Sequence, residues 1–233
     1  MSVMSQIGTL RTYLDRRRLI GRLGLVHRDD VAMLGTEYGG YPVPTSLLNA
    51  DSVCYLAGTG EDISFDLALI ERFGCEVYAF DPVQAAGEYV ARAAADEPRH
   101  HFMPVGLWSS DTTLTFHAPA KEGFVSHSAT NLQDTEAAFE AHVRSIVSLM
   151  QELGHDRVDL LKISAEGAEF EILDHVLAAP IEAQVLCVEF AQPQKVGPVL
   201  DYCRRLQAAG YQLVGLGQWR QWKLTFARDG GTS

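Results

Sequence analysis

The chain has 233 residues, of which 47% are hydrophobic, and it carries a formal net charge of −11. This length fits one sizeable domain that buries enough apolar surface to fold without disulfides or metals. The negative charge would repel a phosphate backbone, which argues against nucleic acid as a partner. No run approaches the roughly 18 apolar residues of a membrane span, and no secretory signal opens the chain, so we expect a cytoplasmic protein.

The first part of the chain holds its one basic cluster. Apolar residues such as Leu14 and Leu19 alternate there with arginines, namely Arg11, Arg16, Arg17, Arg18 and Arg22. We predict a solvated helix that covers the domain, within a helical appendage at residues 1–35 that precedes a main domain at residues 36–233. An amphipathic helix that binds a membrane surface or a partner is the alternative, and the same helix could serve a homodimer.

The cysteines show no spacing typical of a metal site: Cys54, Cys75, Cys187 and Cys203. Cys54 and Cys187 lie within apolar runs, where cysteine behaves as a small hydrophobic residue. We therefore predict reduced thiols in or near the core, which indicates a reducing compartment.

From residue 50 onward, short β-rich runs alternate with segments of helical spacing. In chain order, the first half predicts a strand at Val53–Ala57, a helix at Phe65–Phe73, a strand at Val77–Phe80, a helix at Tyr89–Ala95, and strands at His101–Leu107 and Thr113–His117. Gly74 follows the first of these helices, and glycine tolerates the positive φ that ends a helix.

The second half continues the alternation. It predicts an amphipathic helix at Phe139–Leu153, a strand at Val158–Ile163, a helix at Glu166–Leu177, a strand at Gln184–Phe190, a helix with the buried stripe Val199, Cys203 and Leu206, and strands at Tyr211–Leu216 and Lys223–Ala227. Gly154 and Gly210 close two of the helices, and Pro180 prevents the third from continuing.

The order of these elements predicts the fold class. Strands that alternate with helices form a parallel, doubly wound α/β sheet. The loop between the last two strands is too short for a crossover helix, so they must pair antiparallel. A Rossmann-like sheet that is mostly parallel and ends in a C-terminal antiparallel hairpin is the arrangement of class I methyltransferases, and ordinary dinucleotide-binding domains lack it.

The turn after the first strand reads Ala57-Gly58-Thr59-Gly60-Glu61-Asp62-Ile63-Ser64. Ligands of such sheets bind beyond the carboxyl ends of the strands, and two glycines let the backbone approach a ligand closely. The dinucleotide fingerprint is incomplete because Ile63 occupies the position of its third glycine. Glu61 and Asp62 would repel a pyrophosphate but suit the cationic sulfonium and amine of S-adenosylmethionine, so the turn favours that cofactor over NAD. A purely structural turn is the alternative.

Two further turns complete the expected cofactor site. Asp81 follows the second strand, at the spacing from the glycines where a carboxylate accepts both ribose hydroxyls of an adenosine cofactor. As an alternative, Asp81 is a helix N-cap before Pro82. Val105 and Gly106, after the third strand, could flank the adenine or belong to the core.

Several segments resemble the FkbM family of methyltransferases. Asp159–Phe170 is similar to the family's fourth-strand motif, which usually reads D-L-L-K-[IL]-D-[VI]-E-G-A-E. Gly58–Asp66, Gly74–Pro82 and Tyr38-Gly39-Gly40 are similar to one branch of the family. Together these similarities span residues 36–228.

The resemblance implies a class I fold, S-adenosylmethionine as methyl donor and, usually, O-methylation of sugars, polyketides or other natural products. With the turns, it implies cofactor contacts from Gly58, Gly60, Glu61, Asp62, Ser64, Asp81, Pro82, Val105, Gly106 and Ser164. The chain departs from the family at two positions: Ser164 replaces an aspartate, and Ala191 stands where this branch often has histidine. The missing carboxylate and imidazole put a carboxylate-bound divalent metal in doubt, and we assign no metal ligands.

An alcohol acceptor must lose its proton during methyl transfer, so we expect a base within hydrogen-bond reach. The candidate catalytic residues are Glu166, Glu189, Lys162 and His127. Alternatively, Glu166 only complements a helix dipole, and His127 is a surface residue of a polar loop. Lys162 either pairs with one of the glutamates or holds an anionic group of the substrate.

Tyr38, Gly39 and Gly40 are candidate substrate contacts in a lid. The sequence thus indicates a small-molecule O-methyltransferase that uses S-adenosylmethionine. Ser164 and Ala191 leave open a non-catalytic module of the same fold that binds S-adenosylmethionine or S-adenosylhomocysteine. A nicotinamide oxidoreductase is the third alternative, and Ile63 and the terminal hairpin argue against it.

Overall fold

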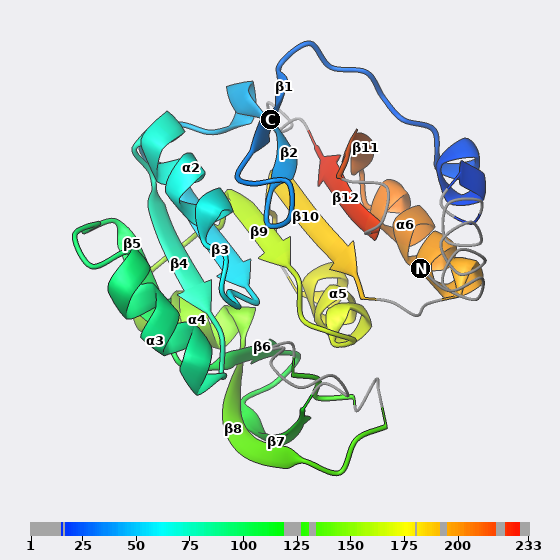
Figure 1. The fold of residues 1–233 in the computed structure, drawn as a ribbon. Helices are drawn as coiled ribbons and strands as arrows, with labels where there is room; N and C mark the ends of the chain where they lie inside the picture. The colour runs from blue at the N-terminus through cyan, green and yellow to red at the C-terminus, as the bar shows by residue number, and fades with distance from the viewer. Residues whose placement is uncertain are drawn as a thin grey trace, which may run out of the picture.

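A computed structural model of the chain describes residues 15, 17–118, 127–130, 134–179, 181–191, 195–217 and 222–228. Its centre is a seven-stranded sheet in the order β11-β12-β10-β9-β3-β4-β5 (Figure 1). The strands are β3 (Val53–Ala57), β4 (Glu76–Phe80), β5 (His100–Met103), β9 (Leu160–Ile163), β10 (Val185–Phe190), β11 (Gln212–Leu216) and β12 (Trp222–Ala227).

The directions of the strands confirm the predicted fold class. Strands β5, β4, β3, β9 and β10 pair in parallel, whereas β12 runs antiparallel to both β10 and β11. The parallel strands therefore end at one edge of the sheet, and this edge carries the turns that the sequence analysis selected.

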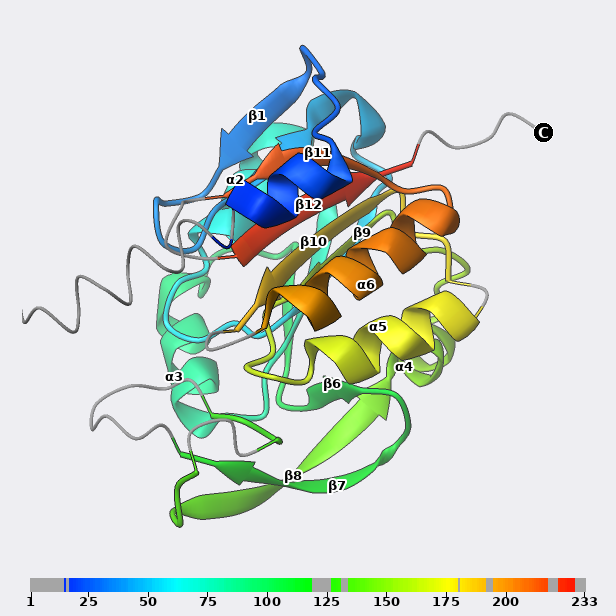
Figure 2. The same ribbon diagram turned by 90° about the vertical axis from the view of Figure 1, so that its right-hand side faces the viewer.

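Helices cover both faces of this sheet, as the doubly wound prediction requires. They are α2 (Ser64–Phe73), α3 (Gln84–Ala93), α4 (Ile146–Leu153), α5 (Glu169–Ala178) and α6 (Val196–Ala208). Along β3, Cys54 and Leu56 face the core that includes α2, whereas Tyr55 and Ala57 face the core that includes α4, α5 and α6. Figure 2 shows α4, α5 and α6 on one face of the sheet. Gly74 and Gly154 end α2 and α4 in the left-handed conformation, as predicted.

A second sheet contains the strand predicted at Thr113–His117 and parts of two elements that were predicted differently. It contains β6 (Gly106–Trp108), β7 (Thr112–His117) and β8 (Ala138–Ser145) in the order β6-β8-β7. The single strand predicted at His101–Leu107 is wrong. The chain turns at Pro104, which has no N–H for a strand ladder, and Val105 N donates to the Met103 carbonyl at 2.8 Å. The two halves, β5 and β6, thus belong to different sheets.

The helix predicted at Phe139–Leu153 is also wrong in its first half. Residues Ala138–Ser145 form β8, and the helix α4 begins only at Ile146. Phe139 and Val143 are four residues apart, a spacing that satisfies both the period of a helix and the period of two of a strand. The Ser145 hydroxyl accepts from Ser148 N at 3.1 Å and so caps the helix at the point where the strand ends.

The N-terminal region packs onto the main core. Residues 17–23 are helical, with Leu19 and Leu23 buried and Arg17, Arg18 and Arg22 exposed, as expected of a solvated helix that covers the domain. Gln207 Nε2 donates to the Leu23 carbonyl at 2.8 Å. Arg11, Arg16 and Pro180 lie outside the described residues. The division of the chain at residue 35 stays a prediction.

Two further predictions concern the whole chain. All four cysteines are buried and free, as predicted. In the part of the chain that the structure describes, no helix combines the length and the apolar character needed to cross a bilayer.

A hairpin that the sequence analysis did not predict lies beside β11 and β12. Its strands are β1 (Val31–Leu34) and β2 (Tyr41–Pro44), paired antiparallel. Its second strand contains Pro42 and Pro44, which are unusual in a strand because proline cannot donate to a ladder. The hairpin matters for the site because its connection contains Tyr38, Gly39 and Gly40.

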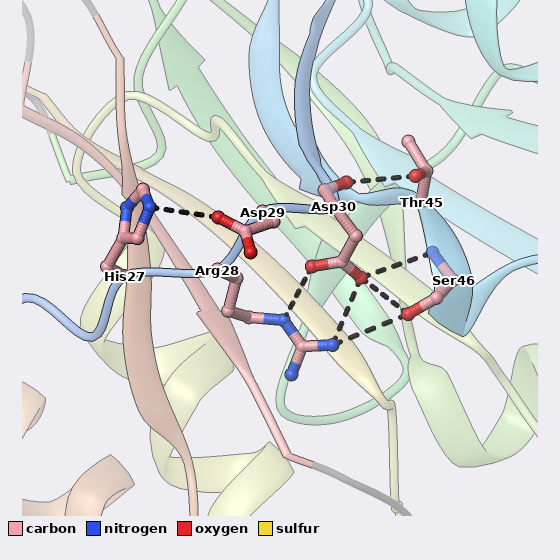
Figure 3. A network of polar contacts seen from close by, with 6 residues as sticks. All are labelled: His27, Arg28, Asp29, Asp30, Thr45 and Ser46. Atoms are coloured by element: carbon pink, nitrogen blue, oxygen red, sulfur yellow. Dashed lines mark hydrogen bonds and ion pairs between the residues drawn. The ribbon is translucent and has the colours of Figure 1, made fainter.

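The base of this hairpin is held by one carboxylate (Figure 3). Asp30 accepts from Arg28 Nε at 2.9 Å and Nη2 at 3.1 Å, and from the Ser46 hydroxyl at 2.5 Å. Thr45 N and Oγ1 both donate to the Asp30 carbonyl at 2.9 Å. Hydrogen bonds from Arg28 and Ser46 lower the pKa of Asp30 well below its usual value.

We expect Asp30→Ala to lower the free energy of unfolding by about 1–2 kcal/mol at pH 7, because charge-assisted hydrogen bonds are lost. A lowered folded-state pKa contributes stability above the unfolded pKa of about 3.9, so the difference between Asp30→Ala and the unaltered protein should shrink as the pH falls below that value. Urea unfolding at pH 7 and pH 3 measures both effects. Asp29→Ala, which removes the exposed carboxylate beside His27, is the matched control and should leave stability unchanged at both pH values.

Candidate active site

A cavity of about 410 Å³ lies at the carboxyl edge of the parallel strands. It brings together most of the residues predicted from the sequence: Tyr38, Gly39, Gly58, Gly60, Glu61, Asp62, Asp81, Pro82, Gly106, His127, Lys162, Ser164, Glu166 and Glu189. Three predicted residues do not line it, namely Gly40, Ser64 and Val105. Ser64 accepts instead from Thr36 N at 2.8 Å, and Val105 packs against the core, as its alternative interpretation had it.

The glycine turn after β3 touches the motif after β9. Gly58 has a φ of 82°, and a Cβ at this residue would lie 1.8 Å from the Ser164 carbonyl oxygen. Lys162 Nζ donates to the Gly58 carbonyl at 2.7 Å. Of the two roles considered for Lys162, pairing with a glutamate is not what the structure shows, because the partner of its Nζ is this backbone carbonyl, and the contact with an anionic substrate group stays a prediction. The side chain fastens the turn of one strand to the neighbouring strand.

Asp81 fastens the same turn from the other side. Its Oδ2 accepts from Thr59 N and Gly60 N, both at 2.9 Å, and its Oδ1 accepts from Val83 N at 2.9 Å. Burial raises the pKa of Asp81 although these three N–H groups favour the charged form. Val83, rather than Asp81, is the N-cap of α3. The carboxylate lies in the cavity wall, and its contact with a ribose stays a prediction.

One wall of the cavity is apolar and is built by both sheets. Phe80 and Pro82 come from the end of β4, and Leu107, Trp108 and Phe116 come from the second sheet. Gly106 keeps this wall tightly packed, because a Cβ there would lie 2.9 Å from Val143 Cγ1 and 3.1 Å from Phe116 Cζ. An apolar lining with aromatic side chains suits an aromatic ring system.

A polar part of the cavity lining, which we call the polar end, centres on Glu189. Glu189 Oε2 accepts from the Ser164 hydroxyl at 3.0 Å and from the Tyr41 hydroxyl at 3.5 Å. Lys223 Nζ lies 3.7 Å from the same oxygen. Tyr41 is fully buried, and burial together with the charge of Glu189 raises its pKa well above the usual value.

Lys223 and Tyr41 are site residues that the sequence analysis missed. The Lys223 side chain is 3% exposed. Its Nζ donates to the Tyr38 carbonyl and lies 4.7 Å from the centre of the Tyr41 ring. Burial lowers the pKa of Lys223. Lys223 is directly opposite Glu189 in the pairing of β12 with β10. The sequence predicted that β12 pairs with β11, but no sequence signal showed that β12 also pairs with β10.

Glu166 and His127 also line the cavity. Glu166 belongs to the turn before α5, since the helix begins at Glu169 and not at the predicted Glu166. The ring of His127 packs against Phe139, with ring centres 5.2 Å apart. Residues 119–126, which precede His127 in the predicted loop, lie outside the described residues.

Glu169, the first residue of α5, contacts the turn beside Glu166 without lining the cavity. It is fully buried, and both of its carboxylate oxygens accept from Gly167 N at 3.0 Å. Burial raises its pKa to about 7. Asp62, by contrast, has a lowered pKa, because hydrogen bonds from Ser64 and Thr36 outweigh its burial. Among the described residues, no group of three or more histidine, cysteine, aspartate or glutamate side chains is arranged to hold a metal ion.

Comparisons with known proteins identify the family. The sequence model described as "Methyltransferase FkbM domain" matches residues 57–213. The human "Probable methyltransferase-like protein 24" is 26% identical over 132 residues, which cover 56% of this chain and 30% of that protein. Its counterpart from Rattus norvegicus is 25% identical over 131 residues, with the same coverage. The match thus spans less than a third of the length of these curated relatives.

The crystal structure of methyltransferase FkbM from Methylobacillus flagellatus KT shares the fold. Its TM-score is 0.52 at 14% identity, and the superposition covers 79% of this chain and 46% of that chain. The class I methyltransferase fold predicted from the order of elements is thereby confirmed. The family match begins in the last residue of β3 and extends into β11, which includes the glycine turn, Asp81 and the β9 motif. The chain therefore belongs to the methyltransferase FkbM domain family.

Proposed function

We propose that this protein is an S-adenosylmethionine-dependent O-methyltransferase that methylates a hydroxyl group of a small molecule, such as a sugar, a polyketide or another natural product. The observation that carries the proposal is that one cavity joins the glycine turn and Asp81 to the polar cluster around Glu189. A cofactor and an acceptor can then meet between these two ends.

The charges of the cavity fit a cationic cofactor. Carboxylates at Glu61, Asp62, Asp81, Glu166 and Glu189 outnumber its lysines, Lys162 and Lys223. An excess of negative charge favours a sulfonium and an amine, and it disfavours phosphate groups. The same charge argues against NAD and against a nucleic-acid backbone. Ile63, buried at the start of α2, also keeps the dinucleotide fingerprint incomplete.

The shape and the hydrogen-bonding groups also fit an adenosine. The apolar wall formed by Phe80, Leu107 and Trp108 suits a purine. Asp81 presents a buried carboxylate at the cavity wall, suited to ribose hydroxyls. Thr59 lines the cavity, and its buried Oγ1 has no hydrogen-bond partner among the described residues.

When bound, S-adenosylmethionine supplies a methyl group that is already activated by a cationic sulfur. The protein's main contribution is then to position the acceptor, which can lower the barrier by several kcal/mol. Glu189 is the first candidate base for the proton of the acceptor hydroxyl, because its carboxylate lies in the polar end of the cavity. Ser164 and Tyr41 orient this carboxylate through their hydroxyls, and Lys223 offsets its charge.

Ser164 changes the chemistry expected from the family motif. An aspartate at this position would place a second carboxylate beside Glu189, where two negative charges repel or share a cation. The serine hydroxyl instead donates to Glu189 Oε2. This arrangement supports acid–base chemistry by Glu189 without a metal bound between two carboxylates. Glu166 and His127 are the other candidate bases.

Asp81→Ala should weaken the binding of S-adenosylhomocysteine by about 1.5–3 kcal/mol if the carboxylate holds the ribose, because charge-assisted hydrogen bonds would be lost. Isothermal titration calorimetry, with and without magnesium, measures the change. Asp96→Ala, which removes an exposed carboxylate after α3, serves as the control and should not alter binding. Equal affinities of Asp81→Ala and the unaltered protein would remove Asp81 from the cofactor site.

Glu189→Gln should lower kcat about 100-fold or more, because the amide cannot accept the proton of the acceptor. Binding of S-adenosylhomocysteine should change little. The measurement is methyl transfer to a panel of sugars and hydroxylated natural products, with Glu166→Gln in parallel to identify the base. If the unaltered protein binds the cofactor but yields no product on a broad panel, and Ser164→Asp restores none, a non-catalytic binding module is the better description.

A further inference from the structure

The turn Glu166-Gly167 connects β9 to α5 in an unusual backbone conformation. Both residues have positive φ, 43° for Glu166 and 100° for Gly167. A glutamate rarely adopts this left-handed region, because its Cβ crowds the backbone. Such strain persists where the surrounding structure holds it in place, and it is concentrated at functional sites.

Two hydroxyl side chains after β7 hold this turn. The Ser128 hydroxyl donates to the Glu166 carbonyl at 2.6 Å. It also lies 3.1 Å from Thr130 Oγ1 and accepts from Thr130 N at 3.2 Å. A Cβ at Gly167 would lie 2.3 Å from Thr130 Oγ1, so the hydroxyls sit directly against the turn. We call Ser128, Thr130, Glu166 and Gly167 the clasp.

The clasp borders the cavity through one of its members, Glu166. The neighbours of Ser128 in the chain, His127 and Ala129, line the cavity. Ser128 itself is buried, and together with Thr130 it contacts the Glu166-Gly167 turn. Burial is the main cause that raises the pKa of Tyr38, and the negative charges of Glu189, Glu166 and Asp62 raise it further. Tyr38 and these three acidic residues all line the cavity.

We propose that Ser128 is a positioning residue that holds Glu166 in this conformation and so keeps the Glu166 carboxylate in the cavity. This carboxylate then favours the cationic methyl donor, S-adenosylmethionine, over the demethylated product, S-adenosylhomocysteine. The positioning role rests on the proposed function, since it takes S-adenosylmethionine as the cofactor. S-adenosylmethionine carries one more positive charge than S-adenosylhomocysteine, and a nearby carboxylate interacts with this additional charge. A cavity that prefers the donor captures it and releases the product more readily.

Loss of the Ser128 hydroxyl should not unfold the turn. The Gly167 N–H also donates to both carboxylate oxygens of Glu169, independently of Ser128. The glycine itself adopts its φ without strain. The expected consequence of Ser128→Ala is therefore a displaced Glu166 side chain in a folded protein.

The experiment measures the Kd values of S-adenosylmethionine and S-adenosylhomocysteine by calorimetry on the full chain. Ser128→Ala should reduce the preference for S-adenosylmethionine about fivefold, the factor expected when a charge at short range in a partly solvated site is displaced. Ser128→Thr keeps a hydroxyl at this position and should therefore retain the preference for S-adenosylmethionine. Ser148→Ala, which removes a hydroxyl bonded to Ser145 outside the cavity, is the control and should not change it.

A double variant separates positioning from general damage. If Ser128 acts through Glu166, Ser128→Ala combined with Glu166→Gln should show the same preference as Glu166→Gln alone. Amide hydrogen exchange should be faster in the peptide that contains residues 164–168 of Ser128→Ala, and unchanged in β3 and β4.

The outcomes distinguish the two proposals. If the unaltered protein binds neither compound, the proposed function is wrong and the positioning role falls with it. If the unaltered protein binds both compounds, and Ser128→Ala weakens both equally or the double variant shows additive losses, only the positioning role is wrong.

Discussion

The close approach of Gly58 to Ser164 is the constraint on which the rest of the site depends. A Cβ at Gly58 would overlap the Ser164 carbonyl oxygen, so only glycine allows the turns after β3 and β9 to meet. Lys162 and Asp81 then fix the glycine turn from its two sides, through the Gly58 carbonyl and through the N–H groups of Thr59 and Gly60. The glycine turn is therefore held by its close contact with the β9 turn and by two side chains from the neighbouring strands β9 and β4.

The cavity is completed by segments that lie beside this core. The second sheet supplies Trp108 and Phe116 to the apolar wall, and β12 supplies Lys223 to the polar end. Lys223, Tyr38 and Tyr41 all lie outside the residues matched by the family model. The matched span thus includes the glycine turn, Asp81 and the β9 motif, whereas Lys223, Tyr38 and Tyr41 come from the flanking segments.

The parts of the site that the sequence predicted are those whose signals are local. The glycine turn, Asp81 and the β9 motif each follow a strand directly, and parallel strands bring their carboxyl ends together. Lys223 could not be found in this way, because its role depends on the pairing of β12 with β10, two strands far apart in the sequence. The helix predicted from Phe139 onward was wrong because the spacing of Phe139 and Val143 fits both the period of a helix and that of a strand. The β1–β2 hairpin was missed because its prolines oppose a strand and the Asp30 network that holds it joins separate turns.

The distribution of buried charge gives an independent reason to place function at this edge. Asp81, Lys162, Glu169 and Lys223 are all buried, and burying a charged group is unfavourable unless partners compensate for the lost water. Asp81 and Glu169 are compensated mainly by backbone N–H groups, and Lys162 by a backbone carbonyl. A sheet that needed only stability could place apolar side chains at these positions. Three of these groups, Asp81, Lys162 and Lys223, line one cavity, as expected where a site must bind and orient a polar ligand. The pKa shifts of Asp81, Glu169 and Lys223 follow from the same burial.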